Sequence, residues 1–524
     1  MGSSKGKREG SEIADSTNPI QELQFADWSL KIASTTLGKS QLFSLHRASW
    51  MFTVIKIPVN SSLITHCFFP PIRLASIIAT CALLTGRNAD AAGTHTWTGV
   101  GAGRNWSTGL NWDTPLDNDG ADDLIFGAST KLNPRANSVA GSGWDVNSIT
   151  FSVLAGGNSA GYVVSGLNTD EILVEALSGV GVVNNSSVLQ TINTRLTLGS
   201  SQSFDALGGD LLLGTIGLGS FNLALNQGGA ARTITLGDVI SGSGAVIKNG
   251  AGTVLVSGAN TFAGGVTVNQ GTLSLANDNG AGSGNIRLNG GTLQSSGTRA
   301  IANNVLVGGG VFGGLDNLTL SGVVSGSSPL VKNGSGSLIL ANANSIAGPV
   351  TVNSGRLVLA ANRALGSVSS LNLSGGRLVL GGSGGDLVNN AAAISMNGGI
   401  IDANNFTEQF GNLTLGSGNN LINLLADNSS GLLTFANISL TAGATLTIAG
   451  WTGTTQASGT DDRIFVSTLL TPTVLNGISF SGFVPGAVQL AGGEIVPVPE
   501  PSMLALLSLG GLGLLAAVRR RQEA

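Results

Sequence analysis

The chain has 524 residues, of which 79 are glycine and only 10% are charged, and its net charge is −4 at pH 7. Its 42% hydrophobic content excludes a disordered chain, its glycines lack the three-residue period of collagen, and the scarcity of basic clusters argues against nucleic-acid binding. Asparagine, serine, threonine, valine and leucine accompany the glycines, which predicts many short strands joined by tight turns.

The N-terminal part looks unlike the rest of the chain. Residues 1–72 carry no repeat, and we expect them to be an unstructured extension or a segment upstream of the true start of translation. An apolar run, Leu74–Leu84, then follows a basic residue, and Ala89 and Ala91 occupy the small-residue positions of a cleavage site. The pattern predicts a secretory signal peptide over 73–91, cleaved after Ala91. A buried strand of an N-terminal domain is the alternative.

Both cysteines, Cys67 and Cys81, precede the expected cleavage site. The mature protein would therefore contain no cysteine, and we expect neither a disulfide nor a thiolate metal site in it.

The segment 92–148 is rich in tryptophan, with Trp97, Trp106 and Trp112 close together. One interpretation is a glycan-stacking face, since planar aromatic rings bind sugar rings. The other is a cap over the open edge of the repeats that follow, which every stacked array requires. The need for such a cap favours the second interpretation.

An acidic stretch within this segment, Asp117–Asp123, places alternate carboxylates around Gly120. Such oxygen ligands suit a hard cation such as Ca²⁺. The twelfth position counted from Asp117 is Ala128, however, and not the glutamate of an EF-hand loop. We therefore expect a solvated turn before a strand, and no metal site.

Internal repeats dominate the middle of the chain. Residues 240–277 and 324–362 align at an offset of 84, which defines units of 232–315 and 316–400 within a longer region, 149–450. The aligned pairs include one lysine, three asparagines and one glycine, namely Lys248/Lys332, Asn249/Asn333, Asn260/Asn344, Asn269/Asn353 and Gly271/Gly355.

Within each unit, apolar and small polar residues alternate in runs of a few residues, as in Val254–Val256 and Leu273–Leu275. Strands this short cannot bury an apolar face alone, so the units must stack. We predict an all-β fold, a parallel β-helix with three or four coils per unit and its valines and leucines inward. The repeated asparagines either form ladders between coils or serve ordinary turns.

The stretches Lys248–Leu275 and, more weakly, Lys332–Leu359 resemble the autotransporter-associated β-strand repeat, also called the passenger-associated transport repeat. The second stretch departs from the first at Ser345-Ile346 and at Pro349. The resemblance implies a right-handed β-solenoid exposed at the cell surface.

Two motifs of catalytic or cofactor-binding type are chance matches in a chain with 79 glycines. Gly381–Gly385 fits the nucleophile pattern Gly-x-Ser-x-Gly, but no histidine follows it. Gly308–Gly313 fits the dinucleotide pattern without the strand–helix–strand context that the pattern needs. We predict no catalytic residue and no cofactor.

Residues 451–496 are less repetitive and can cap the other end, with Trp451 and Phe480 as candidate core residues. The last segment, 497–521, has three parts in order: the triplet Pro499, Glu500 and Pro501, the apolar stretch Ser502–Val518, and the basic cluster Arg519, Arg520 and Arg521. The apolar stretch has 17 residues without a charge, which suits a transmembrane helix at the lower limit of length. A buried C-terminal helix is the alternative.

This tail resembles the PEP-CTERM sorting signal of Gram-negative bacteria. The resemblance implies an exosortase, a sorting enzyme that cuts near the triplet, as a partner. It also implies a precursor held in the inner membrane by 502–518, with Arg519–Arg521 as the membrane stop, and later transfer to the cell surface or the extracellular polysaccharide matrix.

Together these features favour an exported structural or adhesive β-solenoid that is not an enzyme. A polysaccharide-active β-helix enzyme is the first alternative, because catalytic carboxylates can meet from different coils. A carbohydrate-binding surface protein built on the tryptophan-rich segment is the second. Extracellular polysaccharide is a possible partner in each case, and nucleic acid in none.

Overall fold

The computed structural model describes the backbone of five strands between residues 20 and 58, and residues 93–499 apart from 138–142, 154–159, 167–169, 383–384, 425–430, 454–457 and 460–461. The chain divides into two compact units, Met1–Gly86 and Arg87–Ala524. The expected signal peptide, with Ala89 and Ala91, lies outside the described residues.

The N-terminal unit contains a five-stranded antiparallel sheet. We expected no regular structure in 1–72, and these strands differ from that expectation. Apolar residues with a period of two, Trp28, Leu30 and Ile32, are the local signal that favours a strand here. The strands are β1 (Ile20–Phe25), β2 (Trp28–Ala33), β3 (Ser40–Arg47), β4 (Trp50–Phe52) and β5 (Ile57–Pro58).

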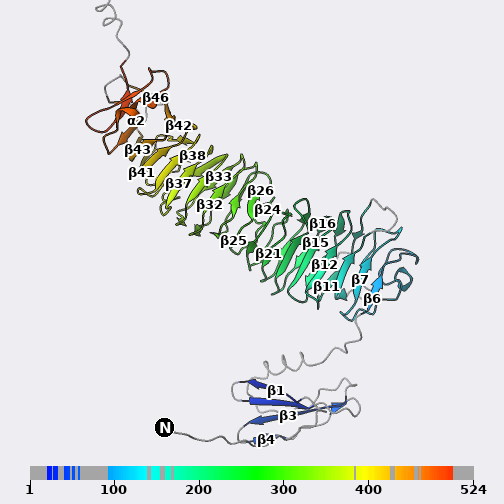
Figure 1. Cartoon of the computed structure of the whole chain (residues 1–524). Helices are drawn as coiled ribbons and strands as arrows, with labels where there is room; N and C mark the ends of the chain where they lie inside the picture. The colour runs from blue at the N-terminus through cyan, green and yellow to red at the C-terminus, as the bar shows by residue number, and fades with distance from the viewer. Residues whose placement is uncertain are drawn as a thin grey trace, which may run out of the picture. The chain divides into compact units, whose positions relative to one another are not determined.

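The second unit is a parallel β-solenoid of about 14 turns, whose coils stack along one axis (Figure 1). Its strands form four parallel sheets that we name by their strand numbers: fifteen, twelve, nine and five. Along the chain, a strand of the twelve-strand sheet is followed by one of the fifteen-strand sheet and then by one on a third side. The five-strand sheet forms this third side in the early coils, and the nine-strand sheet forms it in the later coils. The solenoid therefore has three sides, although among the described residues the third side has no strand between 242 and 298 and the twelve-strand sheet ends at 346.

The twelve-strand sheet contains, in spatial order, β6 (Thr94–Thr96), β7 (Asp123–Phe126), β9 (Ser148–Phe151), β12 (Val180–Asn184), β15 (Gln202–Ala206), β18 (Leu223–Gln227), β21 (Val246–Lys248), β23 (Val266–Val268), β25 (Ile286–Leu288), β28 (Val305–Val307), β31 (Val324–Gly326) and β34 (Ser345–Ile346). The fifteen-strand sheet contains β10 (Val163–Val164), β13 (Gln190–Ile192), β16 (Leu211–Leu213), β19 (Thr233–Leu236), β22 (Thr253–Val256), β24 (Thr272–Leu275), β26 (Thr292–Ser295), β29 (Val311–Phe312), β32 (Leu330–Lys332), β35 (Val350–Val352), β37 (Ser370–Leu373), β39 (Ala393–Met396), β41 (Thr407–Leu415), β43 (Leu432–Leu440) and β45 (Arg463–Val466).

The third side begins with the five-strand sheet, made of β8 (Trp144–Val146), β11 (Glu171–Val174), β14 (Arg195–Leu198), β17 (Ile216–Gly217) and β20 (Ile240–Ser241). It continues as the nine-strand sheet, made of β27 (Arg299–Ile301), β30 (Leu318–Leu320), β33 (Ser337–Leu340), β36 (Arg356–Leu359), β38 (Arg377–Leu380), β40 (Ile400–Asp402), β42 (Asn419–Asn423), β44 (Thr445–Ala449) and β46 (Ile478–Phe480).

The core lies inside the coils and runs along the solenoid. Alternate residues of each strand point inward, and the residues predicted to do so are at most 4% exposed: Val254, Val256, Val266, Val268, Leu273, Leu275, Ile286 and Leu288. Each such residue sits directly against its counterpart in the next coil, because the strands pair in parallel without a shift. The prediction of an all-β parallel solenoid is confirmed.

The sequence repeat and the coil have different lengths. Four successive pairings lead from Val254 through Leu273, Leu293 and Phe312 to Lys332, which is 78 residues further along the chain. The 84-residue repeat is therefore six residues longer than four coils. Equivalent strands consequently change sides: β21 lies in the twelve-strand sheet and its equivalent β32 in the fifteen-strand sheet, and β22 and β33 differ likewise. The two repeat units present the same features on different sides.

Both ends of the solenoid contain irregular elements. The N-terminal end includes the short 3₁₀ helix η1 (Gly109–Asn111). The C-terminal end includes α2 (Pro472–Asn476) and the antiparallel pair β47 (Ala487–Gln489) and β48 (Ile495–Pro497). Within the described ranges, no helix has the length and apolar content needed to cross a membrane. The expected span, Ser502–Val518, lies outside those ranges.

Candidate functional site

The expected sorting residues lie where the described chain ends. β48 is buried and pairs with β47, after which Pro499 is exposed. Glu500, Pro501 and the basic cluster Arg519–Arg521 lie outside the described residues. The triplet thus follows directly on the last strand of the folded unit, where its first residue is accessible.

The three tryptophans predicted as possible glycan-stacking residues are buried. Trp97, Trp106 and Trp112 are 0%, 1% and 3% exposed. Trp112 meets both of the others edge to face, at centroid distances of 5.2 Å from Trp97 and 5.6 Å from Trp106. The Trp97 Nε1 donates to the Lys131 carbonyl oxygen at 2.9 Å. The burial of these rings leaves no ring face open to a sugar, which argues against the glycan-stacking interpretation.

The same burial favours the cap interpretation of 92–148. All three rings pack against Phe126 on β7, and Phe126 stacks on Phe151 of the next coil at 5.3 Å. The aromatic cluster therefore continues the core of the first coils. At the other end, Trp451 meets Phe480 edge to face at 5.5 Å and is 7% exposed. Trp451 and Phe480 thus pack together in the segment 451–496, as expected for a cap at the C-terminal end.

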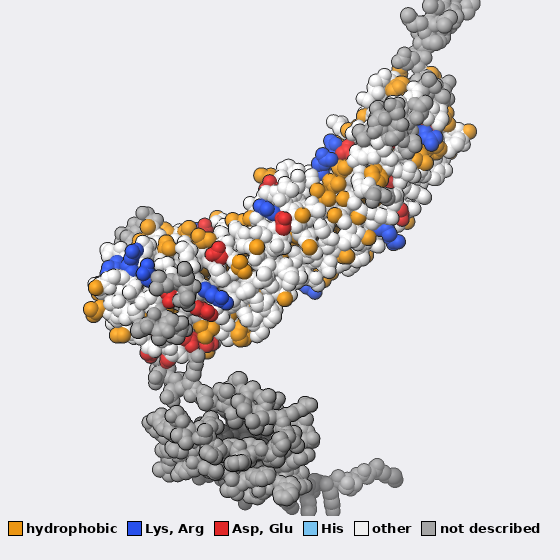
Figure 2. All heavy atoms as spheres, turned by 180° about the vertical axis from the view of Figure 1, so that it is seen from behind, with side chains coloured by type: hydrophobic (Ala, Val, Ile, Leu, Met, Phe, Trp, Pro, Cys, Tyr) orange, Lys and Arg blue, Asp and Glu red, His pale blue; other side chains and the backbone are white. Residues whose placement is uncertain are grey.

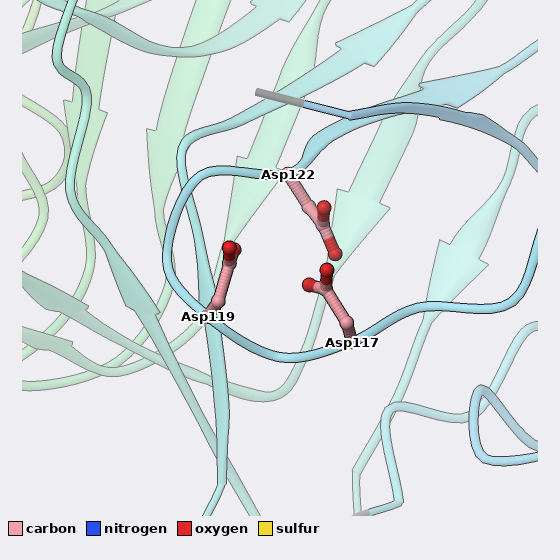
Figure 3. Close-up of side chains that lie close together, drawn as sticks. All are labelled: Asp117, Asp119 and Asp122. Atoms are coloured by element: carbon pink, nitrogen blue, oxygen red, sulfur yellow. The ribbon is translucent and has the colours of Figure 1, made fainter. Parts of the chain in front are cut away.

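The acidic stretch forms a compact cluster. One carboxylate oxygen each of Asp117, Asp119 and Asp122 lies within 4.8 Å of the others. Figure 3 shows the side chains of Asp117 and Asp122 pointing toward each other, with Asp119 beside them on the same loop. Asp117 is exposed, Asp119 half-buried and Asp122 2% exposed.

One histidine anchors this cluster. His95, on β6, donates from Nε2 to Asp122 Oδ1 at 2.9 Å, and its Nδ1 lies 2.9 Å from Thr114 Oγ1. Burial raises the pKa of the Asp122 carboxyl, and the negative charges of Asp117 and Asp119 raise it further, although His95 opposes them. Burial lowers the pKa of His95, but its hydrogen bond to Thr114 and the Asp122 carboxylate outweigh this and leave the pKa raised. The His95–Asp122 pair and the cluster thus form one electrostatic unit.

The repeated lysines point into the solenoid. Lys248 is 0% and Lys332 2% exposed. Lys248 Nζ donates to the carbonyl oxygens of Gly250 and Gln270, and Lys332 Nζ donates to those of Asn333 and Gly334, both at 2.8 Å. Burial lowers the pKa of each lysine to about 8.

The glycine that follows each buried lysine one coil later is required by geometry. Gly271 and Gly355 adopt the left-handed backbone conformation, with φ of +65° and +67°. A Cβ atom on Gly271 would lie 2.6 Å from Lys248 Nζ, and one on Gly355 would lie 2.9 Å from Lys332 Nζ. The burial of these lysines could have been predicted from the sequence, because Lys248 is two residues after the inward-pointing Val246 on β21 and alternate residues of a strand point to the same side.

The repeated asparagines form ladders within each repeat unit. Asn269 Nδ2 donates to Asn249 Oδ1, and Asn289 Nδ2 donates to Asn269 Oδ1, both at 2.8 Å. Asn353 likewise donates to Asn333 at 2.8 Å on another side of the solenoid. Of the two interpretations left open, the ladder is correct for these residues.

The third aligned asparagine pair is buried. Asn260 accepts from the Ile240 amide and donates to the Gly280 carbonyl, and Asn344 makes the equivalent contacts with Val324 and Ala364. Each of these asparagines therefore ties three successive coils together.

A row of uncharged polar residues runs along the outside of the fifteen-strand sheet. The parallel pairing aligns one outward residue from each of five successive strands, β35 to β43, and the row consists of Thr351, Asn372, Ser395, Thr414 and Ser439. We name this set the polar row. An open groove borders the central part of this row, Asn372, Ser395 and Thr414, and is lined also by Ser374, Met396, Asn397, Gly416, Ser417 and Thr441.

The polar row is partly or fully accessible, with Ser395 and Thr414 exposed at its centre. Ser439 Oγ donates to Thr414 Oγ1 at 3.2 Å. Figure 2 shows that uncharged side chains cover most of the face it presents, and that charged groups gather mainly at one end of the solenoid. Sequence reasoning missed the row, because it depends on which outward residues align between coils of unequal length.

Comparison with known families accounts for the repeats and the tail. The family model of the passenger-associated transport repeat matches residues 246–275 and 330–359, and that of the PEP-CTERM protein-sorting motif matches 497–521. The chain carries two passenger-associated transport repeats and a C-terminal PEP-CTERM sorting motif. Both resemblances drawn from the sequence are confirmed. The first repeat spans β21 to β24, and the second spans β32 to β36.

One curated relative aligns with about half of this chain. The chain is 29% identical over 297 residues to the protein named Adhesin BmaC autotransporter from Brucella suis biovar 1 (strain 1330). The alignment covers 51% of this chain but 8% of the adhesin, so the chain spans a small part of that protein. No solved structure matches the chain significantly.

Proposed function

We propose that this chain is an exported, non-catalytic adhesive or structural β-solenoid of the surface of a Gram-negative bacterium. An exosortase-type enzyme sorts it at Pro499–Pro501 after the apolar stretch Ser502–Val518 has held the precursor in the inner membrane. The PEP-CTERM motif supports export and sorting, and the adhesin relative supports a surface role. The right-handed coil direction is what the repeat family implies.

The observation that carries the adhesive role is the polar row. The outward residues of neighbouring coils repeat at the strand spacing of about 4.8 Å, and in this row they are hydroxyl and amide groups over five coils. Such a surface offers hydrogen bonds without charge, which suits a neutral, hydroxyl-rich polymer such as an extracellular polysaccharide. The polymer would lie along the solenoid axis, across the strands.

Sorting is tested by the intact mass of the protein in secreted and membrane fractions of an exosortase-containing host. We expect a released form that begins at Ala92 and ends near Pro499. Replacing the triplet by three alanines (Pro499→Ala, Glu500→Ala and Pro501→Ala) should abolish release and leave the tail attached in the membrane fraction. Asp238→Asn, at an exposed position of the solenoid, is the control and should be released normally. If the unaltered chain also keeps its tail in the membrane, the tail is a plain anchor and the sorting proposal fails.

Adhesion is tested by retention of the full chain on polysaccharide from the same host. The double variant Ser395→Arg and Thr414→Arg places two bulky cations at the centre of the polar row, and we expect retention to fall at least about tenfold. The double variant Thr267→Arg and Thr319→Arg changes outward residues on the other two sides and should bind normally. Equal retention of both double variants would exclude the polar row as the binding surface.

A further inference from the structure

We propose that Asp117, Asp119 and Asp122 bind one Ca²⁺ ion, which fastens the N-terminal cap to the coils that follow. The sequence alone favoured a solvated turn at this position. The folded chain adds two observations that change this interpretation: the spacing of the three carboxylates, and a buried oxygen that lacks a donor.

The spacing of the carboxylates fits a single ion. Ca²⁺ lies about 2.3–2.6 Å from its oxygen ligands, so two ligands on opposite sides of it are about 5 Å apart at most. The three carboxylate oxygens lie within 4.8 Å of one another and come from one loop. One ion between them can therefore contact all three without a rearrangement of the backbone.

The second observation is the buried carboxylate of Asp122. Its side chain is 2% exposed and uses Oδ1 for the bond to His95, whereas Oδ2 meets no hydrogen-bond donor among the residues that the structure describes. A buried carboxylate oxygen without a partner is costly, because its hydration is lost and nothing replaces it. A cation between Asp122, Asp117 and Asp119 supplies the missing partner and offsets the repulsion among three negative charges.

The chemistry of the site favours Ca²⁺ over other metals. Three carboxylates and no thiolate form a hard oxygen set, and Ca²⁺ completes its six to eight ligands with carbonyl groups and water. Zn²⁺ prefers nitrogen and sulfur ligands. The nearby imidazole is already engaged, since His95 Nε2 holds Asp122 Oδ1 and Nδ1 contacts Thr114.

The loop that carries the cluster links three coils. The Asp123 amide donates to the Gly93 carbonyl at 2.7 Å, the Asn147 amide to the Asp122 carbonyl at 2.8 Å, and the Gly120 amide to the Asp145 carbonyl at 3.1 Å. Fixing the loop with an ion thus fixes the first strand, β6, relative to the segment around β8. We expect Ca²⁺ to stabilise the N-terminal end selectively.

The test is a calorimetric titration of the full chain with CaCl₂ after chelation, with thermal unfolding in CaCl₂ and in EDTA. We expect one site with a Kd of about 10⁻⁴–10⁻³ M, the range of extracellular calcium modules, and a higher melting temperature in Ca²⁺. Asp117→Asn, an exposed substitution that does not endanger folding, should weaken binding at least about tenfold. Asp119→Asn should do the same, and Asp238→Asn should not.

Two results would overturn the proposal. One is that the unaltered chain releases or absorbs no heat on titration with CaCl₂ and has the same melting temperature in CaCl₂ and in EDTA. The other is calcium binding of equal strength in the unaltered chain, Asp117→Asn and Asp119→Asn, which would place the ion elsewhere. A site lost in both variants, with unchanged circular dichroism, supports the assignment.

Discussion

Replacing Trp97 by alanine is expected to destabilise the N-terminal end of the solenoid by about 3–5 kcal/mol, the usual cost of removing a buried tryptophan. Trp97 is fully buried, contacts Trp112 edge to face and donates to Lys131. Solenoids unfold in segments, because each coil contacts only its neighbours. Hydrogen exchange should therefore lose protection from β6 to β9, whereas amides beyond β24 keep theirs.

Leu110 provides the matched control for this prediction. It lies in the same tryptophan-rich segment but is 72% exposed, so Leu110→Ala should change the local stability by less than about 0.5 kcal/mol. This pair of variants distinguishes the cap interpretation of the tryptophans from the glycan-stacking interpretation. If Trp97→Ala left the exchange pattern intact and lowered binding to a glycan instead, the cap interpretation would be wrong.

The strand pattern was predictable because strands have a period of two that the sequence records directly. In the runs Val254–Val256 and Leu273–Leu275 the first and last residues are buried, whereas Leu255, an apolar residue between two inward valines, points outward. Stacking was predictable as well, because strands of three or four residues bury nothing alone. These two arguments are local and need no knowledge of how long a coil is.

The side of the solenoid on which each residue lies was not predictable, because it depends on the difference between the length of the sequence repeat and the length of a coil. A six-residue excess over four coils moves Lys332 from the side of Lys248 to the next one. The ladder joins Asn249 to Asn269 in the next coil, whereas Asn333 follows a strand on another side of the solenoid. The polar row escaped prediction for the same reason.

The candidate calcium site shows a different limit of the sequence. The EF-hand comparison tested a fixed ligand spacing along the chain and failed at Ala128. The structure instead brings the ligands together through a turn and buries Asp122 against His95, which is 27 positions away in sequence. Burial and the lack of a donor on one oxygen belong to the fold and leave no trace in residue spacing.

Raising the pH from 8 to about 10.5 is expected to stabilise the repeat region through its two buried lysines. Burial lowers the pKa of Lys248 and of Lys332 to about 8 from 10.5. Between these values the unfolded chain binds more protons than the folded one, so the free energy of unfolding rises with pH. Each lysine contributes about 3 kcal/mol to this rise, at 1.36 kcal/mol per pKa unit. Below pH 8 both lysines are charged in the folded chain as well, so this gain in the free energy of unfolding is absent.

The contribution of one lysine is isolated by Lys248→Met, which keeps the apolar stem and removes the charge. We expect the unaltered chain to gain stability relative to this variant between pH 8 and 10.5, as measured by urea unfolding followed through β21 to β24. Arg287→Met, which replaces an exposed residue on β25 in the same region, is the control, and the stability difference between it and the unaltered chain should not change with pH. A difference between the unaltered chain and Lys248→Met that is equally independent of pH would mean that Lys248 reaches solvent and titrates as a surface lysine.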